Sequence, residues 1–367
     1  MISPRNMISA ISVLMLSGAA ILVNAACSAT INSLADVTNA VKCTNITLNG
    51  FTVPAGQAFI LSLATGTTVT MNGDISFGNK SWAGPLLTIS GKSIIFNGNG
   101  HKLDGGGPFY WDGQGGNGGV KKPSPMIQIN MSGTYQNVKV VNSPVKAYWV
   151  SNPAPLIMTG LTIDNSQGDV PNSKSGGLAA GHNTDGFDIR GATGLTIQNS
   201  NIHNQDDCVA VNIGSNIVFK GNTCTGGHGI SIGSIDSDDT VTGVVISGNT
   251  IVNNDQALRI KTKSASTGST VSNITYSGNI ATGIRKFGVL IDESYPDTLG
   301  TPGTGVIISG VNFVSPATSI TVTSGAQRVA VNCGKGACTG TWNWSNLQVS
   351  GGVAGKITNA VISGYSE

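Results

Sequence analysis

A short sequence motif recurs along most of the chain, and it limits the possible folds more than any other feature. Each copy is a three-residue strand that points inward, outward and inward, and most copies are closed by Gly or Asn, as in Leu195-Thr-Ile-Gln-Asn-Ser. Copies begin at Ile94, Val138, Leu161, Leu195, Ile217, Val244, Ile274 and Val306, so consecutive starts are 44, 23, 34, 22, 27, 30 and 32 residues apart. A period of this size with insertions is typical of a solenoid.

Two kinds of solenoid have repeats of about this length. Leucine-rich repeats would show a Leu ladder and a helix in each repeat, and both are missing here. Short β-branched strands broken by Gly and Asn favour a parallel β-helix. The frequent Asn residues agree, because a side-chain amide at a repeated turn can bond its equivalent one coil away. We therefore expect an all-β fold, a single-stranded right-handed parallel β-helix, over residues 27–367.

A second strand follows the first within each coil. It is predicted at Phe187-Asp-Ile189, Val209-Ala-Val211, Ile230-Ser-Ile232, Leu258-Arg-Ile260 and Val289-Leu-Ile291. The Gly/Ser-rich insertion Gln167–Gly181 is predicted to be a loop beside a groove. Exposed end coils would invite edge-to-edge pairing, so caps are expected at Ile31–Val41 and around Cys333–Trp344.

The beginning of the chain has the features of an export signal. Arg5 precedes an apolar run from Met7 to Val23, and Val23-Asn24-Ala25 supplies the small residues that a signal peptidase accepts. We expect residues 1–26 to be a signal peptide, removed after Ala25 or Ala26, and the mature protein to be secreted and free of the membrane. A buried core helix is the alternative, although nothing amphipathic organises the run.

All six cysteines lie beyond this segment, which favours disulfides in an exported chain. Sequence proximity suggests the pairs Cys27–Cys43, Cys208–Cys224 and Cys333–Cys338. Zinc is the alternative, since His203 and His228 flank the middle pair, but none of the usual C-x-x-C spacings is present.

The charge balance excludes one class of partner. The 20 Lys and Arg residues against 18 Asp and Glu residues give a net charge of +2, without the broad basic field of a nucleic-acid-binding protein. A polyanion would have to be held by a few placed cations. Glycosylation sequons begin at Asn45, Asn79, Asn130, Asn273 and Asn343, and they are compatible with secretion.

Four polar stretches stand at the second strand in successive coils. They are Asn183-Thr-Asp185-Gly, Gln205-Asp206-Asp207-Cys, Gly227-His228-Gly229 and Arg259-Ile-Lys261. Aligning the second strands predicts that Asp185, Asp207 and His228 form one column. Arg259 and Lys261 fall on the outward side. Because neighbouring coils lie about 4.8 Å apart, three carboxylates and a histidine are expected within one to two rungs, with the cation pair on the next rung.

This cluster contains the groups that glycoside hydrolysis needs. One carboxylic acid must protonate the leaving oxygen, and one carboxylate must act on water or on the anomeric carbon. Packing Asp185, Asp206 and Asp207 together makes full ionisation costly, so at least one proton should be retained above the normal pKa. Arg259 and Lys261 suit a substrate with a carboxylate on each sugar.

Structural interpretations compete with this one. Aspartates commonly cap turns, His228 between two glycines could be an ordinary loop residue, and Arg259 with Lys261 could form a solvated face. Adjacent aspartates in line with a third argue against these alternatives, since neighbouring like charges raise the energy of a fold. A calcium site made from the same aspartates is a further alternative.

In their order and spacing, the four stretches resemble the polygalacturonases of glycoside hydrolase family 28. The flanking words His182-Asn-Thr-Asp-Gly-Phe-Asp188, Asn204-Gln-Asp-Asp-Cys-Val-Ala-Val-Asn212 and Gly226-Gly-His-Gly-Ile-Ser-Ile-Gly233 are similar to those of fungal endo-acting members. The resemblance includes the cysteine placement and Ser294-Tyr295-Pro296, and it covers essentially the whole chain beyond residue 26.

The resemblance implies a secreted, monomeric endo-polygalacturonase that hydrolyses α-1,4-D-galacturonosidic bonds in polygalacturonate and pectin with inversion, without metal or organic cofactor. It implies the following roles: Asp206 as general acid, Asp185 and Asp207 as activators of water, His228 as a group that tunes the acid, Arg259 and Lys261 as partners of the galacturonate carboxylate, and Asn183 and Tyr295 as substrate contacts. The expected geometry disagrees with inversion on one point. Carboxylates on adjacent rungs lie about 5 Å apart, and that separation is typical of retaining enzymes. We follow the resemblance, since a base on a rung and an acid from a turn can diverge sideways.

Three other functions are compatible with parts of the pattern. A pectate lyase would use calcium and a basic residue, for which Arg259 is a candidate. A catalytically inert wall-binding solenoid would bind carbohydrate without turnover, but it leaves the clustered aspartates unexplained. Family members that act on rhamnogalacturonan or xylogalacturonan are closer rivals, and Arg259-Ile-Lys261 favours plain galacturonan.

Overall fold

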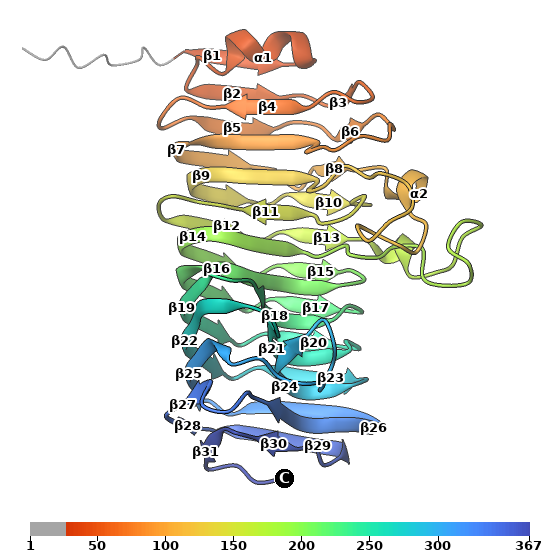
Figure 1. Cartoon of the computed structure of the whole chain (residues 1–367). Helices are drawn as coiled ribbons and strands as arrows, with labels where there is room; N and C mark the ends of the chain where they lie inside the picture. Colours follow the sequence, from red (N-terminus) through yellow and green to blue (C-terminus); the bar gives the residue numbers. More distant parts are fainter. Residues whose placement is uncertain (1–26) are drawn as a thin grey trace, which may run out of the picture.

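The computed structural model describes residues 27–367, so the predicted signal peptide lies outside the described residues. The chain winds as a stack of coils from α1 (Leu34–Ala40) at one end to the C terminus at the other (Figure 1). Strands of neighbouring coils pair in parallel, and connections between parallel strands are almost always right-handed. The predicted parallel β-helix is confirmed.

Each complete coil contributes one strand segment to each of three parallel sheets, which we name the groove, back and side sheets. The groove sheet contains β4 (Phe59–Ser62), the first parts of β7 (Leu87–Asn97) and β9 (Ile127–Gln136), β11 (Tyr148–Val150), the first parts of β14 (Phe187–Gln198) and β16 (Asp207–Lys220), β18 (Gly229–Ile235), β21 (Gln256–Lys263), β24 (Phe287–Tyr295) and the second part of β26 (Thr318–Asn332).

The back sheet contains β1 (Ser28–Ile31), β2 (Asn45–Leu48), β5 (Thr68–Met71), the second parts of β7 and β9, β12 (Leu156–Thr159), the second parts of β14 and β16, β19 (Thr240–Ser247), β22 (Thr267–Ser277), β25 (Gly305–Val314) and β27 (Cys338–Thr339). The side sheet contains β3 (Phe51–Val53), β6 (Ile75–Phe77), β8 (Lys102–Asp104), β10 (Lys139–Val141), β13 (Thr162–Asp164), β15 (Asn201–His203), β17 (Thr223–Thr225), β20 (Thr250–Val252), β23 (Ile280–Ile284), the first part of β26 and β29 (Leu347–Val353).

The predicted register of the second strand is confirmed. Phe187, Val209, Ile230, Leu258 and Val289 pair in succession along the groove sheet. All five side chains are buried, which confirms the predicted inward positions. The same column continues toward the N terminus through Tyr148, Ile127 and Leu87.

The first-strand column was partly wrong. The copies at Val138 and Leu161 lie at β10 and β13, which belong to the side sheet and not to the back sheet. Ile274 pairs with Val311, five residues beyond the copy predicted at Val306. Every face of the solenoid needs the same short strand with alternating inward and outward residues, so similar sequence motifs arise on different faces. Because insertions vary the spacing, the sequence does not show to which face each motif belongs.

Side chains stack along the inside of the coils. Tyr148 and Phe187 have parallel rings with centroids 5.2 Å apart. Buried Asn222, Asn249 and Asn279 form the predicted amide ladder: Nδ2 of Asn222 donates to Oδ1 of Asn249 at 3.3 Å, and Nδ2 of Asn249 donates to Oδ1 of Asn279 at 2.9 Å. These bonds satisfy polar turns inside an apolar stack.

The two ends of the stack are closed differently. Helix α1 lies within the predicted N-terminal cap, with Ala40 buried against the first coils. The C-terminal cap was predicted too early, because Trp342 in β28 (Thr341–Asn343) and Trp344 belong to the core. The final coil follows them as β29, β30 (Ile357–Thr358) and β31 (Val361–Ser363), and β28 pairs with β31 outside the three sheets.

The three predicted disulfides, Cys27–Cys43, Cys208–Cys224 and Cys333–Cys338, are present, and the zinc alternative for the middle pair is therefore wrong. Two short helices, α2 (Gly107–Tyr110) and the 3-10 helix η1 (Ser166–Gly168), lie in the long loops that project from one side of the stack (Figure 1). Across residues 27–367, no helix is long and apolar enough to cross a membrane.

Candidate active site

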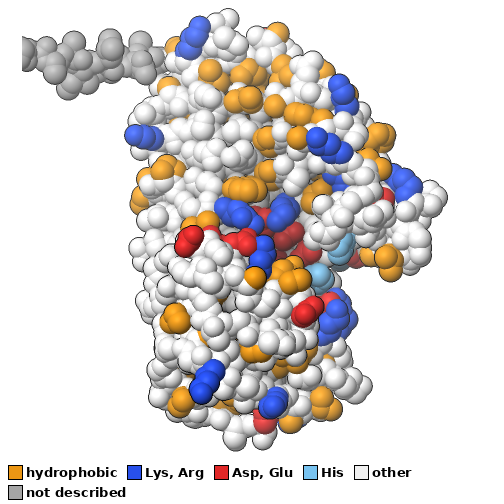
Figure 2. All heavy atoms as spheres, in the orientation of Figure 1, with side chains coloured by type: hydrophobic (Ala, Val, Ile, Leu, Met, Phe, Trp, Pro, Cys, Tyr) orange, Lys and Arg blue, Asp and Glu red, His pale blue; other side chains and the backbone are white. Residues whose placement is uncertain are grey.

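Acidic, basic and histidine side chains meet in a cleft of about 730 Å³ over the groove sheet, near the middle of the stack (Figure 2). All eight predicted catalytic and substrate-binding residues line it: Asn183, Asp185, Asp206, Asp207, His228, Arg259, Lys261 and Tyr295. Most of them come from the connection that leads from the side sheet into the groove sheet, or from the strand that follows it. Equivalent connections in successive coils therefore converge on one place.

Asp206 is buried and held from two sides. Nδ2 of Asn183 donates a hydrogen bond to Oδ2 of Asp206 at 3.0 Å, and Nδ1 of His228 lies 3.1 Å from Oδ1. Asn183 adopts a left-handed conformation with φ of 50°, and its own Oδ1 accepts the backbone N–H of Gly116 at 3.1 Å. Asn183 thus connects Asp206 to the loop of residues 113–122, which forms one wall of the cleft.

The predicted column is wrong for His228. Asp207 pairs with Gly229, and an irregularity between Asp207 and Val209 places Cys208 as an extra residue on β16. Such a β-bulge shifts the register by one residue. His228 consequently lies beside Asp206, and its backbone N–H donates to the Asp206 carbonyl at 2.7 Å. Cys208 is buried in the disulfide with Cys224.

Asp207 is clamped by the predicted cation pair. Nη2 of Arg259 lies 2.5 Å from its Oδ1, and Nζ of Lys261 lies 2.8 Å from its Oδ2. The Ser231 hydroxyl donates to the same Oδ1 at 2.8 Å and accepts from Nε of Arg259 at 3.0 Å. The cations are therefore part of the acidic cluster as well as facing the cleft, where Nζ of Lys261 also lies 5.2 Å from the centre of the Tyr295 ring.

The three aspartates differ in proton affinity. Burial, followed by the charges of Asp206 and Asp188, raises the pKa of Asp185 well above its ordinary value. Its Oδ1 is buried without a hydrogen-bond partner within the described residues. This suits a protonated carboxyl, because burying a neutral group costs less free energy than burying a carboxylate. The sequence predicts that the cluster retains one proton, and among the three predicted aspartates the surroundings of Asp185 favour the protonated form.

Asp206 and Asp207 have pKa values below that of an ordinary aspartate, so they lose their protons at lower pH than Asp185 does. Burial alone would raise the pKa of Asp206, but the hydrogen bond and charge of His228 and the charges of Lys261 and Arg259 together lower it. Burial likewise opposes ionisation of Asp207, and Arg259 and Lys261 outweigh it and lower that pKa. Burial lowers the pKa of His228, whereas the hydrogen bond and charge of Asp206 raise it more. The pairing of Asp206 with His228 thus favours an ionised aspartate and a protonated histidine.

Three further residues of the cluster were missed by the sequence analysis. They are Lys146, Asp188 and Ser231. Nζ of Lys146 forms an ion pair with Oδ2 of Asp188, which is buried beside Asp185. Lys146 stands two residues before Tyr148, the position that Asp185 holds before Phe187, so extending the alignment by one coil would have found it. Asp188 and Ser231 occupy outward positions of predicted strands, where a polar residue faces the cleft.

Oxygen and nitrogen atoms of Asp206, Asp207 and His228 lie within 4.8 Å of one another, which is close enough to hold a metal ion. The cationic groups of Arg259 and Lys261 already bind both carboxylate oxygens of Asp207. A cation at this point would meet two fixed positive charges, so the residues fit a metal poorly.

The sequence and the fold match one family of known enzymes. The profile of Glycosyl hydrolases family 28 matches residues 43–366. The chain belongs to this family. Among known proteins, the chain is 43% identical over 337 residues to a polygalacturonase from Cochliobolus carbonum, an alignment that covers 90% of this chain and 89% of the relative. It is 42% identical over 331 residues to endopolygalacturonase I from Aspergillus aculeatus, covering 89% and 84% of the two chains.

A solved endopolygalacturonase structure shares the fold closely. Endopolygalacturonase I from Stereum purpureum, in complex with two galacturonates, superposes with a TM-score of 0.87 at 48% identity, covering 91% of this chain and 98% of its own.

Proposed function

We propose that this family 28 chain is an endo-polygalacturonase that hydrolyses α-1,4-D-galacturonosidic bonds in polygalacturonate and pectin. The observation that carries the proposal is the contact of Asp207 with Arg259 and Lys261 beside Asp206, which puts reactive carboxylates and carboxylate-binding cations in one cleft. The relatives named above, over most of the chain, support it.

Substrate binding uses the donors that the acidic cluster leaves available. Nε of Arg259 donates to Ser231 and Nη2 donates to Asp207, so Nη1 remains available for the carboxylate of a galacturonate unit. Lys261 offers the further N–H bonds of its ammonium group, next to the Tyr295 ring. Charge-assisted bonds of this kind fix both the position and the orientation of the sugar.

Asp206 is the general acid, and Asp185 with Asp207 activates the attacking water. The unliganded cluster holds its proton on Asp185, so the proton must pass to Asp206 when substrate binds. A substrate carboxylate beside Arg259 and Lys261 offsets their positive charge, which is among the causes that lower the pKa of Asp206. Binding therefore raises the proton affinity of Asp206 and makes it a competent acid.

Two measurements on polygalacturonate test this function. An endo-acting hydrolase lowers viscosity rapidly while few reducing ends appear, and an inverting one releases the β-anomer first, which early NMR spectra resolve. A pectate lyase would instead generate the absorbance of an unsaturated product and stop when calcium is chelated. Carbohydrate binding without any cleavage would favour the inert solenoid.

The mature enzyme begins near Cys27, is secreted, and works as a monomer without a metal or organic cofactor. The three disulfides support an oxidising compartment. N-terminal sequencing of the exported protein and its mass in solution test the first and third statements, and activity that persists in a chelator tests the last.

A further inference from the structure

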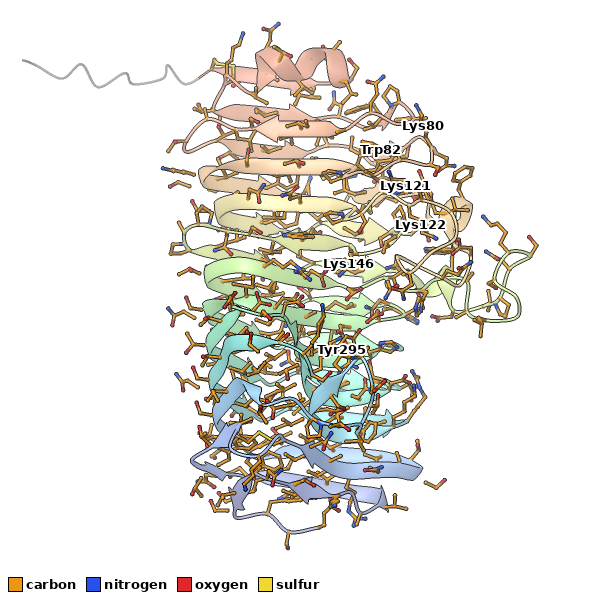
Figure 3. All side chains as sticks on the ribbon, in the orientation of Figure 1. Lys80, Trp82, Lys121, Lys122, Lys146 and Tyr295 are labelled. Atoms are coloured by element: carbon orange, nitrogen blue, oxygen red, sulfur yellow. A yellow bond between two sulfur atoms is a disulfide. The ribbon has the colours of Figure 1, made fainter. Side chains whose placement is uncertain are left out.

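Tyr295 enters the cleft from a strand whose pairing is irregular. It is the last residue of β24, and the loop of residues 296–304 leads from it to β25. Figure 3 shows Tyr295 nearer the C-terminal end of the stack than Lys146, which lines the same cleft. Lys261 pairs with Asp292 and Lys263 pairs with Tyr295, so β24 carries one residue more than β21 between these pairs. A bulge of this kind re-aims the side chain that follows it, which here is Tyr295.

The turn that contains Tyr295 is gathered around the buried carboxylate of Asp292. Oδ1 of Asp292 accepts the Ser294 backbone N–H at 3.0 Å, the Ser294 hydroxyl at 2.6 Å and Nδ2 of Asn332 at 2.9 Å. Oδ2 accepts the backbone N–H of Leu299 at 2.7 Å. The four donors come from both sides of Tyr295 along the chain and from the following coil. One carboxylate therefore ties the beginning of the turn to its end.

Ser294 and Asn332 extend this cluster to Gly300. The Ser294 hydroxyl oxygen accepts the backbone N–H of Gly300 at 2.9 Å, and Nδ2 of Asn332 also donates to the Gly300 carbonyl at 3.0 Å. Ser294 is buried as well. Residues 294–300 thus close around Asp292, and Tyr295 is the residue of this turn that lines the cleft.

The position suits a carboxylate better than an amide. A carboxylate only accepts hydrogen bonds, and all four groups around Asp292 are donors. An Asn here could keep the bonds made by Oδ1, but its own amide would then face the N–H of Leu299. Lys261, the neighbour of Asp292 on β21, pairs with Asp207 instead. Asp292 therefore acts on the turn and not on the acidic cluster.

We propose that Asp292 is a positioning residue, which holds Tyr295 against the galacturonate unit that Arg259 and Lys261 bind. The inference rests on the proposed function, because Tyr295 has a sugar to contact only if the cleft binds this polymer. Asp292 itself lies under the turn and touches no substrate. Its loss should weaken binding and leave the chemical step intact, since the catalytic aspartates lie on other strands.

Steady-state kinetics on polygalacturonate test this role. Asp292→Asn should raise KM by about tenfold and change kcat by less than about twofold, and Tyr295→Ala should do the same. Because Asp292 acts through Tyr295, the double variant Asp292→Asn/Tyr295→Ala should have the KM of Tyr295→Ala alone. Asp297→Asn, which makes the same charge change at an exposed position of the same turn, is the matched control and should keep the wild-type KM.

Hydrogen exchange tests the turn without any substrate. The Leu299 amide should exchange at least about tenfold faster in Asp292→Asn than in the wild type or in Asp297→Asn, because it loses its acceptor. Ser294→Ala keeps the carboxylate and removes only the hydroxyl, so it should speed exchange at Gly300 and raise KM by about threefold. This milder variant carries the same test if Asp292→Asn does not fold.

The possible failures are distinguishable. Faster exchange with a wild-type KM would overturn the role in binding, and so would a double variant whose KM is raised by the product of the two single effects. A wild-type protein that leaves polygalacturonate intact would contradict the proposed function itself, and the exchange rates would still report whether Asp292 holds the turn.

Discussion

The three predicted aspartates of the acidic cluster differ in proton affinity, because the pKa of Asp185 is raised and the pKa values of Asp206 and Asp207 are lowered. The cause is local, because the cations and His228 gather around Asp206 and Asp207, whereas Asp185 faces burial and two negative neighbours. The proposed mechanism needs this asymmetry to reverse between Asp185 and Asp206 when substrate arrives. Substitution of each aspartate tests which one acts as the acid.

Asp206→Asn should lower kcat on polygalacturonate by about 10²- to 10⁴-fold, since the amide cannot protonate the leaving oxygen. A trigalacturonide with a nitrophenyl leaving group does not need that proton, so the same variant should recover most of its activity on this substrate. Asp185→Asn and Asp207→Asn should recover none, because they impair the attacking water. Recovery by Asp185→Asn instead would identify Asp185 as the acid.

Asp185 also predicts how stability depends on pH. Its pKa is raised in the folded state, so the folded protein binds a proton that the unfolded chain releases. The stability that this proton contributes is complete below the unfolded pKa of about 3.9 and is lost as pH rises toward the folded pKa. Asp185→Asn removes the loss, so its free energy of unfolding should match the wild type near pH 3 and exceed it increasingly toward neutrality, by about 1.4 kcal/mol for each pKa unit.

Denaturant titrations at several pH values measure this difference. The exposed Asp238→Asn serves as the control, and its difference from the wild type should stay small across the range. A gain for Asp185→Asn that is the same at every pH would contradict the assignment of the retained proton.

The pH dependence of activity follows from the same groups. As pH falls, Asp207 and the substrate carboxylates become protonated, and the ion pairs with Arg259 and Lys261 weaken. As pH rises through the raised pKa of Asp185, the cluster loses the proton that the leaving group requires. We therefore expect a bell-shaped kcat/KM profile with an acidic optimum, indifferent to chelator. An alkaline optimum that disappears with chelator would favour the lyase.

At the scale of secondary-structure elements, the site depends on a β-bulge in β16. The extra residue, Cys208, turns inward to its disulfide, and Asp206 and Asp207 precede it directly. The bulge therefore decides which aspartate meets His228 and which meets the cations.

The bulge can be tested with two disulfides that close loops of equal size. Cys208–Cys224 and Cys27–Cys43 each span 16 residues, so removing either pair should lower the free energy of unfolding by a similar amount, about 3 kcal/mol. Only the Cys208→Ala/Cys224→Ala variant should also lose kcat, by about 10²-fold, because it releases the aspartates from their positions. Equal activity of the two variants below their melting temperatures would show that the bulge holds without its disulfide.

The elements show where sequence reasoning succeeds and where it fails. The register of the second strand was predictable, because inward apolar residues at Phe187, Val209 and Ile230 repeat without insertions in each strand. The bulge at Cys208 was not, since a single extra residue leaves the apolar pattern intact. The loop of residues 113–122 has no period at all, so its hydrogen bond to Asn183 became visible only in three dimensions.

At the scale of the whole molecule, a solenoid has two open ends that must be covered. The final coil pairs with β26 through β29 and β30, and the Tyr365 ring lies 6.2 Å from that of Trp344. These last residues protect an edge of 15 residues in β26.

Deleting residues 347–367 should therefore produce a protein that associates. The uncovered strand β26 would present unpaired backbone groups to a second copy, as exposed edges do. Light scattering after size-exclusion chromatography should show oligomers for this variant. Deletion of residues 366–367 alone is the control and should leave the wild-type mass. A truncated chain that stays monomeric with an unchanged melting temperature would show that the last coil is dispensable.

The stacking of coils has a consequence for how such an enzyme can be altered. The predicted aspartates, His228, Arg259 and Lys261 lie in or directly before the groove-sheet strands β14, β16, β18 and β21. The strands of each coil pair only with those of its two neighbours, although the loop of residues 113–122 also reaches Asn183. A coil inserted or removed upstream of β7 would therefore lengthen or shorten the groove sheet without moving one catalytic group relative to another. The catalytic residues and the length of the groove sheet can therefore change independently of each other, whether by natural descent or in the laboratory.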